Sequence, residues 1–300
     1  MRKRLGRKQR KKQKKILIIG SLSLLLFLCV GYAAFQTNLS ITAKGNIKEQ
    51  TASELLRKKC NATSGDGLYK DEYEDGRCIY KGTNPNNYIT FNNETWRIIS
   101  LEADNTIKIM RNECISNMIW DSSNSNNWDR PSTLNTYLNE EYLKTITINQ
   151  DKIVSHPWSI GLIIDDNVDL FSQINDEDKT QSQSTNIGMI TVSEYLRANA
   201  NIEKCGNLNT NNLNLLTCRD TNWMYSIVPS GFLWLLSPSA THQNEVFYVY
   251  GHGAGAGDVS DVSTDYTSDG GGAVTPSLYL SADTILKGIG TENSPYIITN

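Results

Sequence analysis

Four aspartates in one glycine-rich stretch near the C-terminus have the spacing that best fits metal binding. They are Asp258, Asp261, Asp265 and Asp269, within GHGAGAGDVSDVSTDYTSDGGG. Carboxylate oxygens on a flexible backbone are the ligands that Ca²⁺ prefers. Because the stretch lacks the DxDxDG pattern of a calcium loop, two interpretations stay open: a calcium site, or acids that solvate an exposed loop. No other cofactor is expected.

Aromatic side chains near the same stretch are candidates for ligand contact. Trp128 stands in a polar loop as Asn-Trp-Asp, which is the nearest approach in this chain to the Trp-Asn-Asp pattern of sugar-binding lectins. Tyr248, Tyr250 and Tyr266 flank or lie within the polar segment 250–272. Loops rich in Asn, Ser, Gly and Tyr adapt to polar partners at low entropic cost. We therefore expect these four aromatic residues to contact an extracellular glycan or protein.

The histidines give no catalytic or metal-binding pattern. His156, His242 and His252 are widely spaced, and the chain has no GxSxG segment to supply a serine nucleophile. The GHGAGAG run does not open a helix after a strand and lacks the Lys-Ser/Thr of a phosphate-binding loop. We expect no catalytic residue.

Carboxylates offer the one enzymatic alternative. Glycoside hydrolysis needs two of them facing each other across a cleft, roughly 5–10 Å apart. The adjacent acids Glu140-Glu141 and Asp165-Asp166 are available, although adjacency along a chain does not make a paired site. A cell-envelope hydrolase on the same scaffold is therefore the alternative to a binding module.

The cysteines indicate an oxidising compartment. Five of the six follow the apolar N-terminal segment: Cys60, Cys78, Cys114, Cys205 and Cys218. Their spacing predicts disulfides between Cys60 and Cys78 and between Cys205 and Cys218, each worth roughly 3 kcal/mol for a loop of about 15 residues. Cys114 is left over as a free thiol. Five buried thiols are the alternative.

An apolar segment, residues 16–35, decides where the chain works. It has twenty residues without a charge, and a helix of that length spans a bilayer core of roughly 30 Å. Residues 1–15 carry ten Lys or Arg and no acid, whereas the remainder carries 19 basic and 32 acidic residues, a charge of −13. This asymmetry predicts a single-pass membrane protein, anchored in lipid through residues 1–35, with a cytoplasmic N-terminus and an extracellular body that does not bind nucleic acid.

The segment also has features of a cleavable signal peptide. Gly31, Ala33 and Ala34 are small enough for a peptidase site, but the apolar stretch is longer than the 7–15 residues usual in a signal peptide. We expect a retained anchor, with cleavage as the alternative.

The extracellular part divides into a connector, residues 36–83, and an α+β domain, residues 84–300. The connector is polar, with one short helix ending before Cys60 and a loop closed by the first disulfide. In the domain, YITF, WRIISLE and IKIMRN predict three antiparallel strands, and TLNTYLNEEYL predicts an amphipathic helix that Ser132 caps. FLWLLSP, EVFYVYG and AVTPSLYLS predict further strands. IGLIIDD is compatible with a strand but has no clear periodicity. FSQINDEDKTQSQSTN indicates an exposed insertion.

Eight motifs in order carry a family resemblance. YKGTNPNNYITFNNETWRIISL, NNWDRPSTLNTYLNEEYL, IGMITVSEYLRANA, NWMYS, FLWLLSP, VFYVYG, AVTPSLYL and GTENSPYIIT together resemble bacterial surface proteins of Gram-positive type, which carry a C-terminal domain of unknown function. The closing segment is similar to the C-type-lectin-like domain of formylglycine-generating enzymes. Their activity is not implied, because the last cysteine here, Cys218, precedes the FLWLLSP strand. Thr275 stands where many members have Arg.

These observations predict a transmembrane helix followed by an extracellular domain built on mixed antiparallel sheets and C-type-lectin-like in fold. The function that fits is a membrane-anchored binding or adhesion module of a bacterial cell surface, without enzymatic activity.

Overall fold

A computed structural model describes residues 49–164, 170–206, 216–253, 259–266 and 271–299. By its internal contacts the chain divides into two units, residues 1–49 and residues 50–300, and every element below belongs to the second. Among the described residues, no helix is long and apolar enough to cross a membrane. The predicted anchor, residues 16–35, lies outside them.

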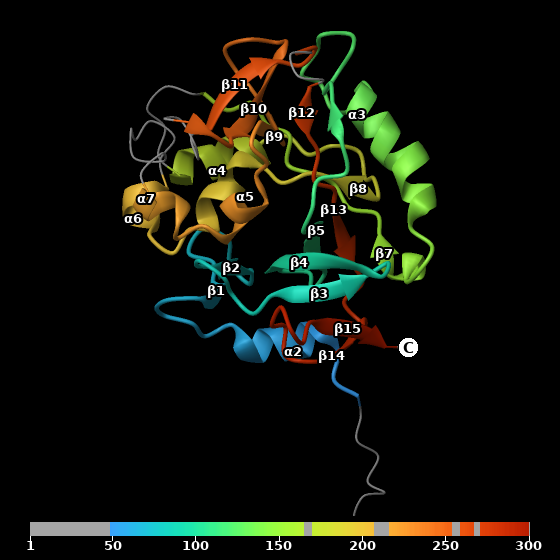
Figure 1. Cartoon of the computed structure of the whole chain (residues 1–300), viewed down its shortest axis with the longest axis vertical. Coiled ribbons are helices and arrows are strands. Elements are labelled where there is room, and N and C mark those ends of the chain that lie inside the picture. The colour runs from blue at the N-terminus through green and yellow to red at the C-terminus, as the bar shows by residue number, and fades with distance from the viewer. Residues whose placement is uncertain (1–48, 165–169, 207–215, 254–258, 267–270, 300) are drawn as a thin grey trace, which may run out of the picture. The chain divides into compact units, whose positions relative to one another are not determined.

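A ten-stranded sheet forms one half of an α+β fold (Figure 1). Its main path runs β14-β15-β3-β4-β5-β13-β7, and all pairs along it are antiparallel except β15 with β3. The β1–β2 hairpin joins at β4, and β8 pairs with β13. The strands are β1 (Gly67–Lys70), β2 (Cys78–Lys81), β3 (Tyr88–Phe91), β4 (Glu94–Leu101), β5 (Ile107–Arg111), β7 (Ile153–Val154), β8 (Ile187–Gly188), β13 (Ser277–Leu280), β14 (Ile285–Lys287) and β15 (Tyr296–Thr299).

The three predicted strands β3, β4 and β5 are confirmed. Asn92 and Asn93 join β3 to β4 with φ of 52° and 59°, the left-handed backbone that a two-residue hairpin requires. The last six residues of β4 are all buried, so this strand is covered on both faces.

A five-stranded sheet forms the other half, in the order β11-β10-β9-β12-β6. Its strands are β6 (Asn117–Met118), β9 (Phe232–Pro238), β10 (Glu245–Tyr250), β11 (Val259–Ser263) and β12 (Gly272–Ala273). The β9 and β10 strands were expected from the sequence. The β11 strand was not, because its residues stood in a stretch interpreted as one long loop. It pairs with β10 over five residues of each strand.

Short helices surround the two sheets. They are α2 (Ala52–Lys59), α3 (Thr133–Thr136), α4 (Leu170–Asp178), α5 (Val192–Arg197), α6 (Ile202–Cys205) and α7 (Leu216–Arg219). Single turns of other helix types occur at Tyr137–Glu141 (π) and at Tyr142–Thr145, Gln150–Lys152 and Trp223–Ile227 (3-10). A capping box starts α5, in which the side chains of Thr191 and Glu194 bond each other's backbone amides.

One local prediction is confirmed with a change in helix type, and the others were wrong. The predicted amphipathic helix starts at its Ser132 cap and buries Leu134, Leu138 and Tyr142, but it passes into a π turn at Tyr137–Glu141. The presumed insertion contains α4, whose Gln173 and Glu177 are buried although they are polar. The connector loop contains β1, and of IGLIIDD the described residues form only an isolated bridge at Ile163.

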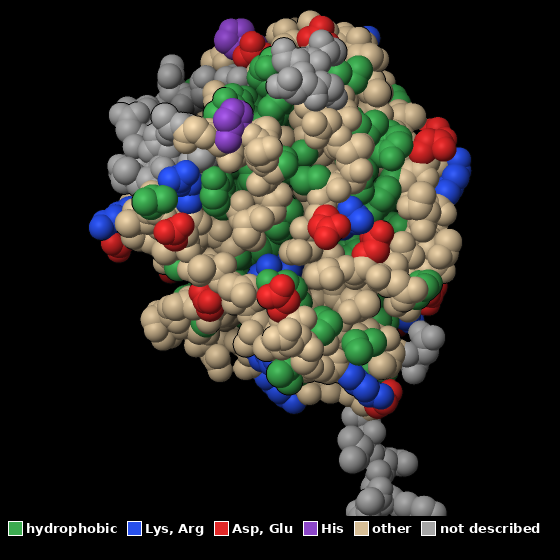
Figure 2. All heavy atoms as spheres, in the orientation of Figure 1, with side chains coloured by type: hydrophobic (Ala, Val, Ile, Leu, Met, Phe, Trp, Pro, Cys, Tyr) green, Lys and Arg blue, Asp and Glu red, His purple; other side chains and the backbone are tan. Residues whose placement is uncertain are grey.

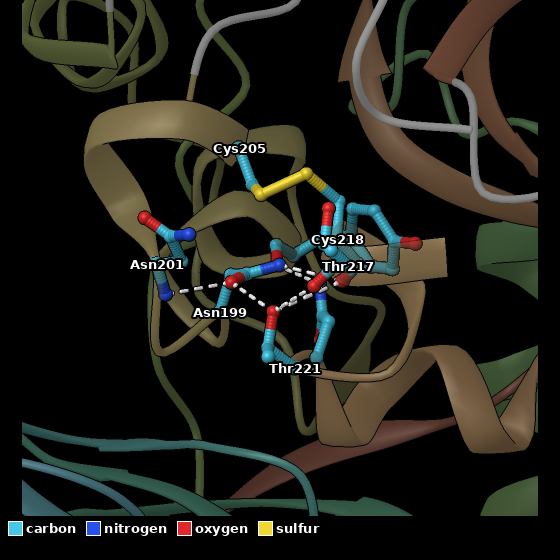
Figure 3. Close-up of a disulfide and its surroundings, with 8 residues drawn as sticks. Asn199, Asn201, Cys205, Thr217, Cys218 and Thr221 are labelled. Atoms are coloured by element: carbon cyan, nitrogen blue, oxygen red, sulfur yellow. Dashed lines mark hydrogen bonds between the residues drawn. A yellow bond between two sulfur atoms is a disulfide. The ribbon is translucent and has the colours of Figure 1, made fainter. Parts of the chain in front are cut away.

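Both predicted disulfides form, and Cys114 is the free cysteine among the described residues. The Cys205–Cys218 bond ties α6 to α7 (Figure 3). Beside it, Asn199 donates from Nδ2 to the carbonyl of Cys218 at 2.7 Å and accepts from Thr221 Oγ1 at 2.8 Å. The covalent bond and the amide side chain therefore hold the same short segment.

Candidate functional site

The strongest candidate for recognition is an aromatic face on the five-stranded sheet, formed by Phe232, Tyr248, Tyr250, His252 and Tyr266. Phe232 begins β9, the first two tyrosines lie on β10, and Tyr266 follows β11. His252 is exposed and the other four are half-buried. Figure 2 shows hydrophobic side chains at the surface of the half of the molecule that holds this sheet. Aromatic residues that keep part of their surface exposed in one group mark a contact surface.

The rings of the aromatic face touch in a continuous series. Phe232 lies 5.0 Å from Tyr248 and 5.4 Å from Tyr266 between ring centroids, both edge to face. Tyr248 lies 6.2 Å from Tyr250, which stacks on His252 at 4.8 Å. Each ring limits the rotation of the next, so little side-chain entropy remains to be lost when a ligand binds.

Strand alternation places Phe232, Tyr248 and Tyr250 on one side of β9 and β10, where Phe232 and Tyr248 pack in part against the first core cluster. On β9 and β10, Leu233, Phe247 and Val249 point the other way and are buried in the second of two core clusters. Trp234 is buried in the first core cluster, with its ring 4.8 Å from that of Phe232, and donates from Nε1 to the carbonyl of Met118 at 2.7 Å. The aromatic face is therefore supported by Trp234 on its own side of the sheet and by the second core cluster on the other.

The structure does not bring Trp128 to the aromatic face. Its side chain is 1% exposed, and its ring lies 5.6 Å from that of Trp120 in the core. A ring with so little exposed surface is not available for stacking on a ligand. Of the four aromatic candidates, the structure therefore groups the three tyrosines and adds Phe232 and His252.

The four aspartates are only partly visible. Asp258 and Asp269 lie outside the described residues, and of Asp261 only the backbone, in β11, is described. Asp265 is exposed and accepts a hydrogen bond from Ser263 Oγ at 2.5 Å. Within the described part of the chain, no three His, Cys, Asp or Glu side chains form a group that could hold a metal. Calcium binding at these aspartates stays a prediction.

A second candidate is a charged pocket of about 280 Å³ beside the ten-stranded sheet. Its charged and phenolic side chains come from the β1–β2 hairpin loop, β5, α4, α5 and β13, with one carboxylate from the end of β4. They are Glu74, Arg77, Glu102, Lys108, Glu177, Asp178, Glu194, Arg197 and Tyr279. Residues so far apart in sequence meet here because β5 and β13 are neighbours in the sheet and α4 packs against α5.

Glu194 is the centre of the charged pocket. Its Oε1 accepts from Lys108 Nζ at 2.6 Å and from Arg77 Nη2 at 3.1 Å, and all three residues are buried. Burial alone would raise the pKa of this carboxyl, but the two cations outweigh it and bring the pKa to about 2. Glu194 is therefore ionised at neutral pH.

Glu177 in the same pocket has the opposite shift. Burial raises the pKa of its carboxyl, and hydrogen bonds from Ser193 and Ser237 offset only part of that effect. Ser237 Oγ donates to Oε1 at 2.6 Å and the Ser193 amide at 3.2 Å. Two carboxyls whose pKa values move apart in one pocket are the arrangement used in acid–base catalysis, and they also occur in structural ion-pair networks.

Glu140 and Glu141, two of the acids proposed for an enzyme, do not line this pocket. Glu140 and Glu141 are exposed, and Glu141 pairs with Lys144 at 3.5 Å. Asp165 and Asp166 lie outside the described residues. The capping box pointed to Glu194, but nothing in the sequence indicated that its carboxylate is buried between two cations.

Comparisons with models of protein families, with curated proteins and with solved structures found no match. The resemblance to bacterial surface proteins therefore stays a prediction.

Proposed function

We propose that this protein is a membrane-anchored binding module that displays its aromatic face outside the cell and binds a glycan there. The observation that carries the proposal is the series of touching rings on the aromatic face. Tyrosine and histidine combine an apolar body with a polar tip, so they can stack on a sugar ring and hydrogen-bond its hydroxyls.

Location outside the cell is part of the same proposal. Two disulfides are typical of chains exposed to an oxidising compartment, and the basic block before the apolar segment 16–35 favours a cytoplasmic N-terminus. We further propose that the two sheets and short helices of residues 50–300 are arranged as in C-type-lectin-like domains, consistent with a non-enzymatic adhesion role.

A glycan array probed with the full chain in detergent tests the proposal. We expect binding to a subset of glycans and a loss of about tenfold or more in Tyr266→Ala, because removing a ring from the centre of a contact surface costs more than about 1 kcal/mol. Tyr137→Ala is the matched control, since Tyr137 is also half-buried but lies outside the aromatic face. Chelator added in parallel shows whether calcium contributes.

Two results would count against glycan binding. Equal binding by wild type and Tyr266→Ala would move the site away from the aromatic face. No binding to any glycan, together with a protein ligand whose affinity depends on Tyr266, would make the aromatic face a protein-binding surface.

The charged pocket supports a second candidate, a cell-envelope hydrolase. The opposite pKa shifts of Glu177 and Glu194 favour it. It ranks second because both carboxylates already hold hydrogen bonds from the protein. Hydrolysis of purified cell-wall material that disappears in Glu177→Gln, with stability unchanged, would replace the binding proposal.

A further inference from the structure

A second cavity, of about 710 Å³, lies between the β1–β2 hairpin and α6. Its size is within the range of small-molecule sites. The charged residues that line it are Glu72, Lys81 and Glu203, with Tyr69 and Asn201 among their neighbours. None of these belongs to the aromatic face or to the charged pocket.

Lys81 is the unusual member of this cavity. It ends β2 and is only 5% exposed, yet within the described part of the chain its ammonium makes no hydrogen bond or ion pair. Its Nζ lies over the ring of Tyr69, at 5.3 Å from the centroid. The buried Lys108, by contrast, bonds Glu194 at 2.6 Å. The Nζ of Lys81 is not among the fully buried side-chain nitrogens, so the ammonium borders the cavity and can pair with the anionic group of a ligand.

The pKa of Lys81 also reflects the removal of its side chain from water. Burial lowers the pKa of Lys81, and the nearby carboxylates of Glu72 and Asp71 only partly restore it. Asp71 is already engaged, because it accepts from Arg197 Nη1 at 2.6 Å. A ligand carboxylate is therefore the kind of group that would satisfy Lys81.

The two glutamates of the cavity indicate the charge at the other end of the ligand. Glu72 and Glu203 are exposed, and neither has a hydrogen bond or ion pair with any described residue. Lys81 attracts an anion to the cavity, whereas these two carboxylates would repel it. A molecule with a carboxylate at one end and an ammonium at the other avoids this conflict.

The two disulfides brace the walls of the cavity. The wall residues 63–73 lie in the loop that Cys60 and Cys78 close, and Lys81 follows three residues later. The opposite wall includes α6, whose last residue, Cys205, is bonded to Cys218 (Figure 3). Walls that are already held in place lose less conformational entropy when a ligand binds.

We propose that this cavity binds a small zwitterion, an amino acid or a short peptide, with its carboxylate on Lys81 and its ammonium toward Glu72 and Glu203. The proposal is independent of glycan binding at the aromatic face, since the two sites share no residue.

Three dipeptide probes test it by isothermal titration against the full chain. Dialanine carries both charges, N-acetyl-dialanine lacks the ammonium, and dialanine amide lacks the carboxylate. We expect dialanine to bind and each blocked probe to bind about tenfold more weakly or worse, because a lost charge-assisted bond costs roughly 1.5–3 kcal/mol. Equal binding of all three probes, or no binding of dialanine at 10 mM (about 3 kcal/mol of affinity), would overturn the proposal.

Two lysine variants test whether the dialanine site lies at Lys81. Lys81→Met should abolish dialanine binding, and Lys70→Met, in the same hairpin but exposed and outside the cavity, should not change it. If Lys81→Met does not fold, acylation of the wild type followed by mass spectrometry gives the same answer. Dialanine should then slow acylation of Lys81 and leave Lys70 unaffected, whereas equal rates for Lys81 with and without dialanine would contradict the assignment.

Discussion

Replacing Glu194 by Gln should destabilise the protein strongly at neutral pH and much less in acid. The substitution keeps the capping box, because Gln can also bond the backbone of Thr191. It removes the negative charge that Lys108 and Arg77 share. Arg77 retains Glu74 and Glu102, whereas Lys108 has no other ion pair among the described residues. A buried cation left without its partner costs about 3–5 kcal/mol.

The pH dependence follows from the folded-state pKa of about 2, against 4.5 for a free carboxyl. A lowered pKa stabilises the folded state fully above about pH 5, and this contribution is lost as the pH falls toward 2. It amounts to about 3 kcal/mol at pH 7, of which about 2 kcal/mol is gone at pH 3. The difference in stability between wild type and Glu194→Gln should therefore shrink from about 3 to about 1 kcal/mol.

Urea unfolding at pH 7 and pH 3, with disulfides kept intact, measures both values. Glu141→Gln is the control, because Glu141 pairs with Lys144 in the open and should change stability by less than about 0.5 kcal/mol at either pH. A wild-type-to-Glu194→Gln difference that is equal at the two pH values would refute the reasoning. It would mean that Glu194 is protonated in the native protein or that its cations are solvated.

Three further predictions concern other parts of the fold. Glu177→Gln should have the opposite pH dependence. Because the pKa of Glu177 is raised in the folded state, the wild type loses stability as the pH rises above 4.5, and the variant should become more stable relative to it. A stability difference in urea unfolding that stays constant with pH would contradict this. Replacing both Cys205 and Cys218 by Ala opens a link across 13 positions and should cost about 3 kcal/mol, read as a lower urea midpoint; an unchanged midpoint would show that the bond adds nothing. Cys114 should react with a thiol reagent at least about tenfold more slowly in the native than in the urea-unfolded protein, because burial raises its thiol pKa; similar rates would show that the site is open.

Apolar periodicity predicted the strands well where one pattern dominated. FLWLLSP and EVFYVYG became β9 and β10, and the Asn92-Asn93 pair marked the β3–β4 turn because Asn tolerates the left-handed backbone. Helix caps were equally readable, since a cap depends on side chains three residues apart. These signals are local, so the sequence contains them in full.

The burial of polar side chains could not be predicted from the sequence. The helix α4 looked like an exposed insertion because Gln173 and Glu177 are polar, yet both are buried against other elements. The β11 strand was hidden in a Gly-, Asp- and Ser-rich stretch, and only pairing with β10 makes it a strand. Such elements depend on long-range partners, which no local pattern specifies.

The candidate sites divide along the same line. Tyr248 and Tyr250 were predicted as contacts because they are aromatic residues beside a polar segment, and alternation along β10 places both on one face. The charged pocket and Lys81 were missed, since their chemistry arises when residues distant in sequence meet in a buried space. Trp128 was predicted as a contact from its residue type and its polar Asn-Trp-Asp context, and the fold buries it.

Protease treatment of intact cells that carry the protein with a C-terminal tag tests the central claim, that residues 50–300 present the aromatic face outside the cell. Our account predicts that the tag is removed from intact cells, with no need for lysis. A tag that survives on intact cells and is lost only in a lysate would place the body of the chain inside and contradict extracellular recognition.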